Sequence, residues 1–181
     1  MTAILDLSAH IIDSGDVTTS SNRISNELSP VADRVWIIES FSHVVLVETD
    51  DGLVAFDSSS ANFGPKVMVA LRGWTDEPIN TLVYTHGHVD HTGGSRHFAA
   101  DAEDNSHRRP RVLGHRNLAR RHDRYRRTNG YNQTINLRQF GGLPSELSAE
   151  KLSRSFVVDG TMPVTVDYED DVVDEVGSLR R

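Results

Sequence analysis

The sequence predicts an α/β domain built in layers, and three observations lead to this prediction. Short runs of Val, Ile, Leu, Trp and Phe between residues 34 and 60 are separated by polar breaks, a pattern typical of consecutive β-strands. Helix-like and strand-like segments then alternate from residue 63 to residue 115. The length of 181 residues fits one domain. Strands followed by alternating helices and strands favour a sheet covered by helices.

Residues 34–60 are expected to form three strands of an antiparallel meander. The stretch "TDDG" at 49–52 is a turn signal between two of these strands, because Gly52 can adopt a positive φ without steric cost. A helix is expected over 63–74, where apolar residues recur at helical spacing. Pro65 supports this helix, because proline is favoured in a first helical turn.

The chain after this helix continues the alternation. We expect a short buried strand over 79–85, a helix that begins after Gly93, and another strand over 110–115. The basic stretch 116–132 combines helix signals with a terminating Asn-Gly pair. The closing segment 162–181 alternates apolar and acidic residues, which is typical of two strands at a sheet edge.

Composition excludes several kinds of site and partner. The chain has no cysteine, so disulfides, thiolate ligands and a cysteine nucleophile are excluded, and a metal would need His, Asp or Glu. No apolar stretch reaches the ~20 residues of a membrane helix, and the N-terminus lacks the basic start and apolar core of a signal peptide. We therefore expect a cytoplasmic protein with no membrane partner. The net charge of −7 disfavours a nucleic-acid partner.

Charge is distributed unevenly along the chain. Ten arginines lie between Arg108 and Arg138, where Asp123 is the only acidic residue, whereas the stretch after Ser155 is rich in Asp and Glu. One interpretation is that the two parts are solvated surfaces that attract each other. The other is a basic wall that binds anions, because guanidinium groups pair well with tetrahedral oxyanions.

The strongest motif is "THGHVDHTGG" at 85–94, where three histidines and an aspartate lie within six residues, directly after an apolar run. His86 and His88 are two residues apart, so their rings can point to the same side and bind one metal ion. The glycines allow close backbone turns, and the loop follows a strand, where α/β proteins place their sites. Imidazoles and carboxylates are common ligands of Zn²⁺, Mn²⁺ and Fe. A surface loop that happens to contain histidines is the less favoured alternative.

This motif resembles the H-x-H-x-D-H signature of the metallo-beta-lactamase superfamily. The resemblance implies an αβ/βα sandwich in which His86 and His88 hold one metal, while Asp90 and His91 hold a second and Asp90 is also catalytic. It implies two Zn²⁺ ions in an intact site, with Mn²⁺ or Fe as other candidates. Asp57, which closes the strand-like "LVAFD", matches a supporting aspartate and could orient a histidine. An ordinary aspartate at a strand end is the alternative.

Residues 112–141 are similar to the corresponding region of sulfatase-like members of this superfamily, in the Arg-Tyr pair, "GYN" and "N-x-RQFG". The similarity covers roughly residues 30–175 and implies hydrolysis of an anionic sulfate ester by a metal-bound hydroxide. Arg126 and Arg138 are then candidates for substrate binding, and His115 could line the site, although a structural role is favoured. A non-catalytic metal-binding remnant and a hydrolase of lactones or thioesters are the alternatives.

The resemblance also implies metal ligands that this sequence does not supply. A site with two metals needs more than four protein ligands, and no histidine follows His122. We therefore expect residues 30–181 to be the N-terminal part of such a domain, after an N-terminal extension of residues 1–29, with impaired activity. An incomplete sandwich would expose apolar strand faces and unpaired edges, which favour aggregation or a homo-oligomer.

Overall fold

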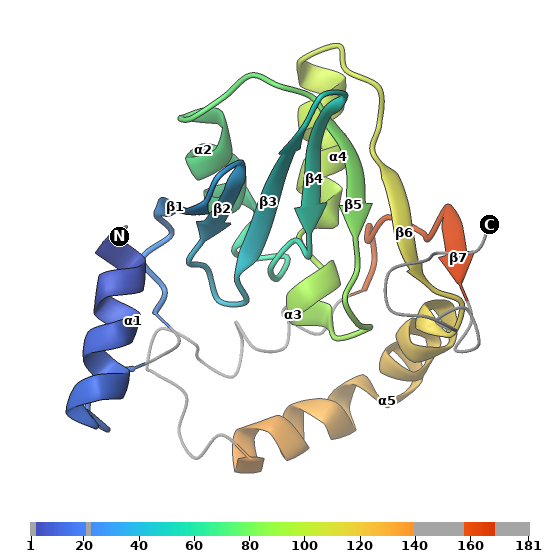
Figure 1. The fold of residues 1–181 in the computed structure, drawn as a ribbon. Coiled ribbons are helices and arrows are strands. Elements are labelled where there is room, and N and C mark those ends of the chain that lie inside the picture. The colour runs from blue at the N-terminus through green and yellow to red at the C-terminus, as the bar shows by residue number, and fades with distance from the viewer. Residues whose placement is uncertain (1–2, 21–22, 140–157, 169–181) are drawn as a thin grey trace.

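The computed structural model describes residues 3–20, 23–139 and 158–168, without the side chains of 133 and 136–139. Within these residues a single sheet has seven strands in sequential order (Figure 1). The elements are α1 (Ala3–Ser14), β1 (Leu28–Ala32), β2 (Val35–Ile38), β3 (Val44–Thr49), β4 (Gly52–Phe56), α2 (Gly64–Arg72), β5 (Ile79–Val83), α3 (Val89–Thr92), α4 (Ser95–Asp104), β6 (Arg111–His115), α5 (Leu118–Gln139) and β7 (Val166–Tyr168). The expected α/β class is confirmed.

The first four strands pair antiparallel, and three of them confirm the expected meander. Gly52 has a φ of +109°, and an ideal Cβ at this position would lie 2.6 Å from the Pro78 carbonyl oxygen. Glycine is therefore required there for space as well as for conformation. The sequence pattern did not predict β1, in which Pro30 fits the outermost position because an edge strand tolerates a missing backbone N–H.

Strands β4 to β7 pair parallel, so helices must carry the chain back between them. Helix α2 connects β4 to β5, and α3 and α4 connect β5 to β6. Pro65 lies in the first turn of α2, as expected. The Tyr84 hydroxyl at the end of β5 donates a hydrogen bond of 2.9 Å to the Met162 carbonyl oxygen, which attaches the segment before β7 to the sheet.

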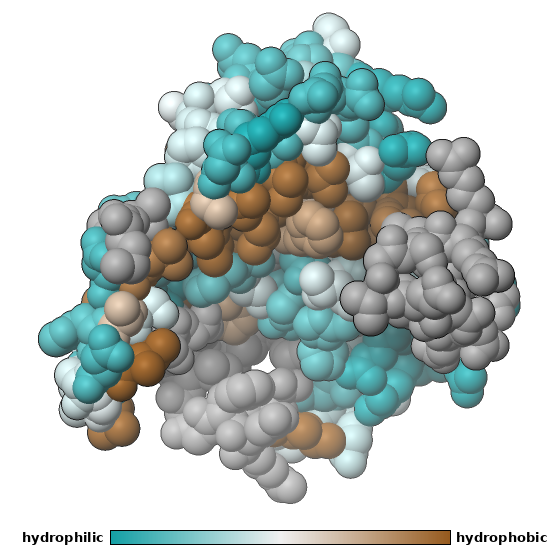
Figure 2. Space-filling model, in the orientation of Figure 1, coloured by the Kyte–Doolittle hydropathy of each residue, from teal (hydrophilic) through white to brown (hydrophobic). Residues whose placement is uncertain are grey.

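The two faces of the sheet differ in how they are covered. One face lies against α2 and α4, and its central row is fully buried: Leu46, Ala55, Leu82 and Val112. The opposite face carries an equally apolar row that is only partly buried: Val45, Phe56, Val83 and Leu113. Figure 2 shows an apolar band across the strands on the face turned toward the viewer. Among the described residues, this is the kind of uncovered strand face that the sequence predicts.

Helix α5 is longer than the sequence predicts. The Asn-Gly pair at 129–130 was expected to end the helix, but α5 continues to Gln139, and only Thr128 departs from helical torsion angles (φ −120°, ψ 20°). Side-chain bonds bridge this kink, because the Thr128 hydroxyl donates to the Arg124 carbonyl at 2.8 Å and accepts from Asn132 Nδ2 at 2.9 Å. The helix therefore bends at Thr128, next to the Asn-Gly pair, and does not end there.

The closing segment contributes β7, which pairs with β6. The second strand expected in this segment falls at 169–181, outside the described residues. A search of the described helices finds none with the length and apolar character to span a membrane.

Candidate metal centre

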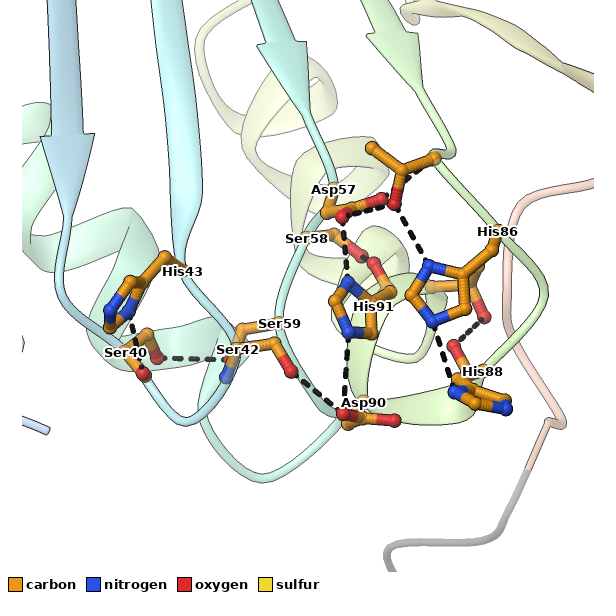
Figure 3. A network of polar contacts seen from close by, with 12 residues as sticks. Ser40, Ser42, His43, Asp57, Ser58, Ser59, His86, His88, Asp90 and His91 are labelled. Carbon is orange, nitrogen blue, oxygen red and sulfur yellow. Dashed lines mark hydrogen bonds and ion pairs between the residues drawn. The ribbon is translucent and has the colours of Figure 1, made fainter. Parts of the chain in front are cut away.

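The histidine motif lies at the carboxyl end of β5, next to the carboxyl end of the parallel strand β4 (Figure 3). Adjacent parallel strands place their carboxyl ends at the same edge of a sheet, which is where α/β proteins bind ligands. Asp57, directly after β4, therefore faces the metal loop, the name used here for residues 85–94. The expected location of the motif at a strand end is confirmed.

A close approach of two backbone segments fixes the metal loop. The Ser58 N–H donates to the His91 carbonyl at 2.7 Å, and the Gly94 N–H donates to the Ser59 carbonyl at 3.0 Å. An ideal Cβ at Gly94 would lie 1.9 Å from the Ser58 carbonyl oxygen, so only glycine fits there. Asp57 and Ser59 adopt φ values of 63° and 58°, a conformation that costs free energy in residues other than glycine and is frequent at functional sites.

Asp57 is buried, and its carboxylate accepts three hydrogen bonds. Oδ1 accepts from the Thr85 backbone N–H at 2.8 Å, and Oδ2 accepts from the Thr85 hydroxyl and from His91 Nδ1, each at 2.7 Å. Because a carboxylate only accepts, His91 must carry its proton on Nδ1, which leaves Nε2 as the ligand atom. This geometry matches the expected role of Asp57 in orienting a histidine.

Thr85 extends the influence of Asp57 to a second histidine. The Thr85 hydroxyl donates its proton to Asp57, so it can only act as an acceptor toward His86. His86 Nδ1, which lies 3.0 Å from the Thr85 hydroxyl oxygen, therefore carries a proton. His86 then also presents Nε2 without a proton. One buried carboxylate thus sets the ring orientation and protonation of His86 and His91, an arrangement common behind metal-binding histidines.

The four ligand candidates of the motif form two adjacent pairs. His86 Nε2 lies 3.0 Å from His88 Nδ1, and His91 Nε2 lies 3.5 Å from Asp90 Oδ2. Two ligand atoms at the usual distances from a tetrahedral Zn²⁺ are about 3.3 Å apart, so each pair could hold one ion. The rings of His86 and His91 are 4.0 Å apart between centroids, which places the two pairs side by side.

A different trio, Asp57 with His86 and His91, also has ligand atoms within 4.8 Å of one another. We favour the two pairs of the motif over this trio. Both oxygens of Asp57 already accept hydrogen bonds, so a metal bound to Asp57 would have to displace Thr85 or His91. Asp57 therefore suits the role of a support better than that of a ligand.

The pKa shifts of His86 and His88 favour metal binding, whereas that of His91 opposes it. Burial lowers the pKa of His86, and the neighbouring His91 and His88 lower it further. Burial and the charge of Arg121 lower the pKa of His88, against the opposing effect of Asp90. Metal ligation requires a neutral imidazole, and the lowered pKa of both rings favours that form. For His91 burial acts in the same direction, but the hydrogen bond to Asp57 and the charge of Asp90 raise its pKa overall.

Sequence reasoning did not identify Ser42, in the turn between β2 and β3. Its hydroxyl donates to Asp90 Oδ2 at 2.7 Å, and its N–H donates to Ser59 Oγ at 3.4 Å. Ser59 Oγ lies 3.0 Å from Ser40 Oγ, so three serines form a network that reaches the metal loop (Figure 3). Serines in a turn have no characteristic spacing, and no signal in the sequence could have distinguished Ser42.

The remaining predicted residues lie in other surroundings. Arg126 on α5 forms ion pairs with Asp123 at 2.7 Å and Asp159 at 3.8 Å. The side chain of Arg138 lies outside the described part of the chain. His115 accepts a hydrogen bond of 3.2 Å from the Asn117 N–H and packs edge-on against Tyr168, with centroids 5.4 Å apart. These contacts support the structural role favoured for His115.

Comparison with known proteins gives curated relatives that resemble parts of the chain. The 2,4-dinitroanisole O-demethylase subunit alpha of Nocardioides sp. (strain JS1661) is 35% identical over 105 residues, 56% of this chain. A linear primary-alkylsulfatase of Pseudomonas sp. (strain ATCC 19151) is 34% identical over 59 residues, 32% of this chain. The chain spans 32% of the length of the first relative and 11% of the length of the second.

Solved structures also resemble the chain in part. The sec-alkylsulfatase Pisa1 from Pseudomonas sp. matches with a TM-score of 0.43 and 23% identity over 52% of this chain and 16% of that chain. A metallo-beta-lactamase of Cronobacter sakazakii matches with a TM-score of 0.46 and 18% identity over 57% of this chain and 38% of that chain.

The family itself is identified from the sequence. The model of the metallo-beta-lactamase superfamily matches residues 37–179, which include β3, β4, the metal loop and α5. This match covers most of the 181 residues. The chain belongs to the metallo-beta-lactamase superfamily.

Proposed function

We propose that the metal loop belongs to a metal-dependent hydrolase of small anionic esters, with alkyl sulfates as the preferred class. The observation that carries this proposal is the pairing of ligand atoms, His86 with His88 and Asp90 with His91, at separations of 3.0 Å and 3.5 Å. The partial similarity to a linear primary-alkylsulfatase supports the choice of sulfate esters.

The donor set fits Zn²⁺, with Mn²⁺ or Fe as alternatives, because it offers imidazole nitrogens and a carboxylate and no sulfur. Bound metal would supply Lewis acidity and an activated water. His86 and His88 would hold one ion, and Asp90 and His91 would hold the other. Asp57 keeps the proton of His91 on Nδ1, and Ser42 fixes the Asp90 carboxylate through Oδ2. Asp90 is the residue of this set to which we assign a catalytic role.

Metal uptake tests the ligand assignment. Zinc titration of residues 1–181 should give saturable binding that the His86→Ala/His88→Ala variant weakens strongly, because these rings provide half of the four ligands. The matched control is His10→Ala, which removes a histidine from α1 and should leave uptake unchanged. Equal uptake by the double variant and the unmodified protein would refute the assignment.

A substrate panel tests the reaction class. We expect residues 1–181 to hydrolyse a medium-chain alkyl sulfate poorly even with Zn²⁺ or Mn²⁺, because the metal loop offers only two ligand candidates to each metal, which would position the nucleophile poorly. If residues 1–181 hydrolyse the alkyl sulfate efficiently and Asp90→Ala abolishes this turnover, the expectation of impaired activity is wrong. Turnover of a lactone or thioester instead of the sulfate would change the substrate class. Absence of turnover together with tight zinc binding would favour a non-catalytic metal-binding role.

A further inference from the structure

We infer that Arg121 is the anion-binding residue of the metal centre, with its guanidinium group placed by Tyr125 to bind the negatively charged group of the substrate. Arg121 lies in the first half of α5, and Arg126 and Arg138 on the same helix were the arginines that the sequence favoured. This inference rests on the proposed function, which places the anionic substrate at the metal loop. Three features of the structure lead to Arg121.

The first feature is direct packing between Arg121 and the metal loop. An ideal Cβ on Gly87, the residue between His86 and His88, would lie 2.9 Å from Arg121 Cγ and 3.1 Å from Arg121 Cβ. The stem of Arg121 therefore lies against the backbone that joins two ligand candidates.

The second feature is the way in which the guanidinium group is held. Arg121 Nη2 donates a hydrogen bond of 3.2 Å to the Tyr125 hydroxyl, and the guanidinium carbon lies 5.1 Å from the centre of the Tyr125 ring. Tyr125 is itself buried with Val89 of α3 and with Val158. A guanidinium group fixed on a buried ring loses less side-chain entropy when it binds an anion than a free surface arginine does.

The third feature is the charge around Arg121. A groove of about 770 Å³ runs along α5, and its lining includes Arg120, Arg121, Arg124 and Arg127, with Asp123 as an acidic member. The ion pairs found among the described residues leave Arg121 without a carboxylate partner, whereas Arg126 is paired with Asp123 and Asp159. Arg121 thus contacts the metal loop and also lines a basic groove, so its remaining N–H donors can serve an oxyanion.

Inorganic sulfate is the probe for this inference. Residues 1–181 would be titrated with sulfate at constant ionic strength, with chloride as the balancing anion, in the absence and in the presence of Zn²⁺. Binding would be followed by the backbone amide NMR signals of residues 85–94, which are present in the unmodified protein and in every variant. Glutamine keeps the Cβ and Cγ atoms that contact Gly87, so this variant removes the charge while it preserves the packing.

We expect Arg121→Gln to weaken sulfate binding about tenfold and Arg121→Lys to weaken it less, because lysine keeps the charge and loses the planar fork. The matched control, Arg124→Gln, removes an exposed arginine of the same groove and should change the affinity less than about twofold. Unchanged binding in Arg121→Gln, or an equal loss in Arg124→Gln, would overturn the inference.

Zinc uptake separates this inference from the proposed function. Arg121→Gln should take up zinc like the unmodified protein, because Arg121 is not a ligand candidate. If the unmodified protein binds no zinc, the proposed function fails, whereas the assignment of Arg121 fails on the sulfate titration alone.

Discussion

The metal loop carries the candidate metal ligands and helix α5 carries many of the arginines, but the two segments are held in different ways. The metal loop is fixed by short hydrogen bonds to the buried Asp57 and by backbone contacts with Ser58 and Ser59. Helix α5 instead presents exposed arginines, and its Arg126–Asp123 pair joins side chains that are 51% and 57% exposed. Buried hydrogen bonds fix geometry, whereas exposed ion pairs contribute little free energy.

This difference matches what the proposed function would require of each segment. Two bound metals would constrain ligand atoms to within a few tenths of an ångström, so a rigid metal loop would favour binding. A charged group attracts an anion over a longer range, so most of α5 needs only its charge. Arg121 combines the two requirements, because it packs on the metal loop and is held by Tyr125. Substitutions should therefore have large effects in the metal loop and small effects along most of α5.

The largest contrast is expected between two glycine substitutions. Gly94→Ala should destabilise the protein by about 3 kcal/mol, because the new Cβ would overlap the Ser58 carbonyl oxygen. Gly130→Ala in α5 meets nothing within 4 Å and should raise the free energy of unfolding by up to about 1 kcal/mol, because alanine favours helix. Urea unfolding of both variants measures this contrast. Equal stability of the two variants would show that the metal loop is not tightly packed.

A smaller effect is expected when the charge beneath the histidines is removed. Asp57→Asn should lower zinc affinity by roughly 10- to 100-fold, because an amide cannot accept all the hydrogen bonds now donated by Thr85 and His91. Asp123→Asn provides the control, because it removes an exposed carboxylate from α5 and should leave zinc affinity unchanged. Zinc titration in competition with a chelator distinguishes the two variants. A comparable loss in both would indicate a general charge effect.

The contact of Ser42 with the metal loop should have a more modest effect. Ser42→Ala removes one hydrogen bond to Asp90 Oδ2 and should lower zinc affinity by about fivefold. Ser40→Ala changes a serine of the same turn that reaches Ser59 but not Asp90, and should have less effect. The same competition titration measures both. If Ser40→Ala proves the more harmful, the network acts on the backbone and does not act through Asp90.

The smallest effect is expected for Arg126→Gln. This arginine is already paired with Asp123 and Asp159, so its loss should change sulfate affinity less than about twofold. Its exposed position predicts a change of less than about 0.5 kcal/mol in the free energy of unfolding. Sulfate titration beside Arg121→Gln gives the comparison. A loss as large as that in Arg121→Gln would support the assignment of Arg126 made from the sequence.

The sequence by itself determined the α/β class, the order of the meander and crossover elements, and the four ligand candidates of the motif. These features are local, because hydrophobic periodicity marks single strands and helices, and the four candidates lie within residues 86–91. Local signals were weaker at the ends. Strand β1 contains Pro30 and gave no clear strand pattern, and the Asn-Gly pair in α5 was overcome by side-chain bonds around Thr128.

Only the tertiary structure decided which distant residues complete the site. The sequence offered Asp57 as a candidate support or as an ordinary strand-end aspartate, and its contact with His91 follows from the parallel pairing of β4 and β5, which brings their carboxyl ends together. Ser42 reaches Asp90 across 48 residues of sequence because the β2–β3 turn lies at the same edge of the sheet. Arg121 was selected from ten similar arginines by the close approach of α5 to Gly87. Such contacts depend on strand register and helix docking, which neither residue type nor spacing along the chain encodes.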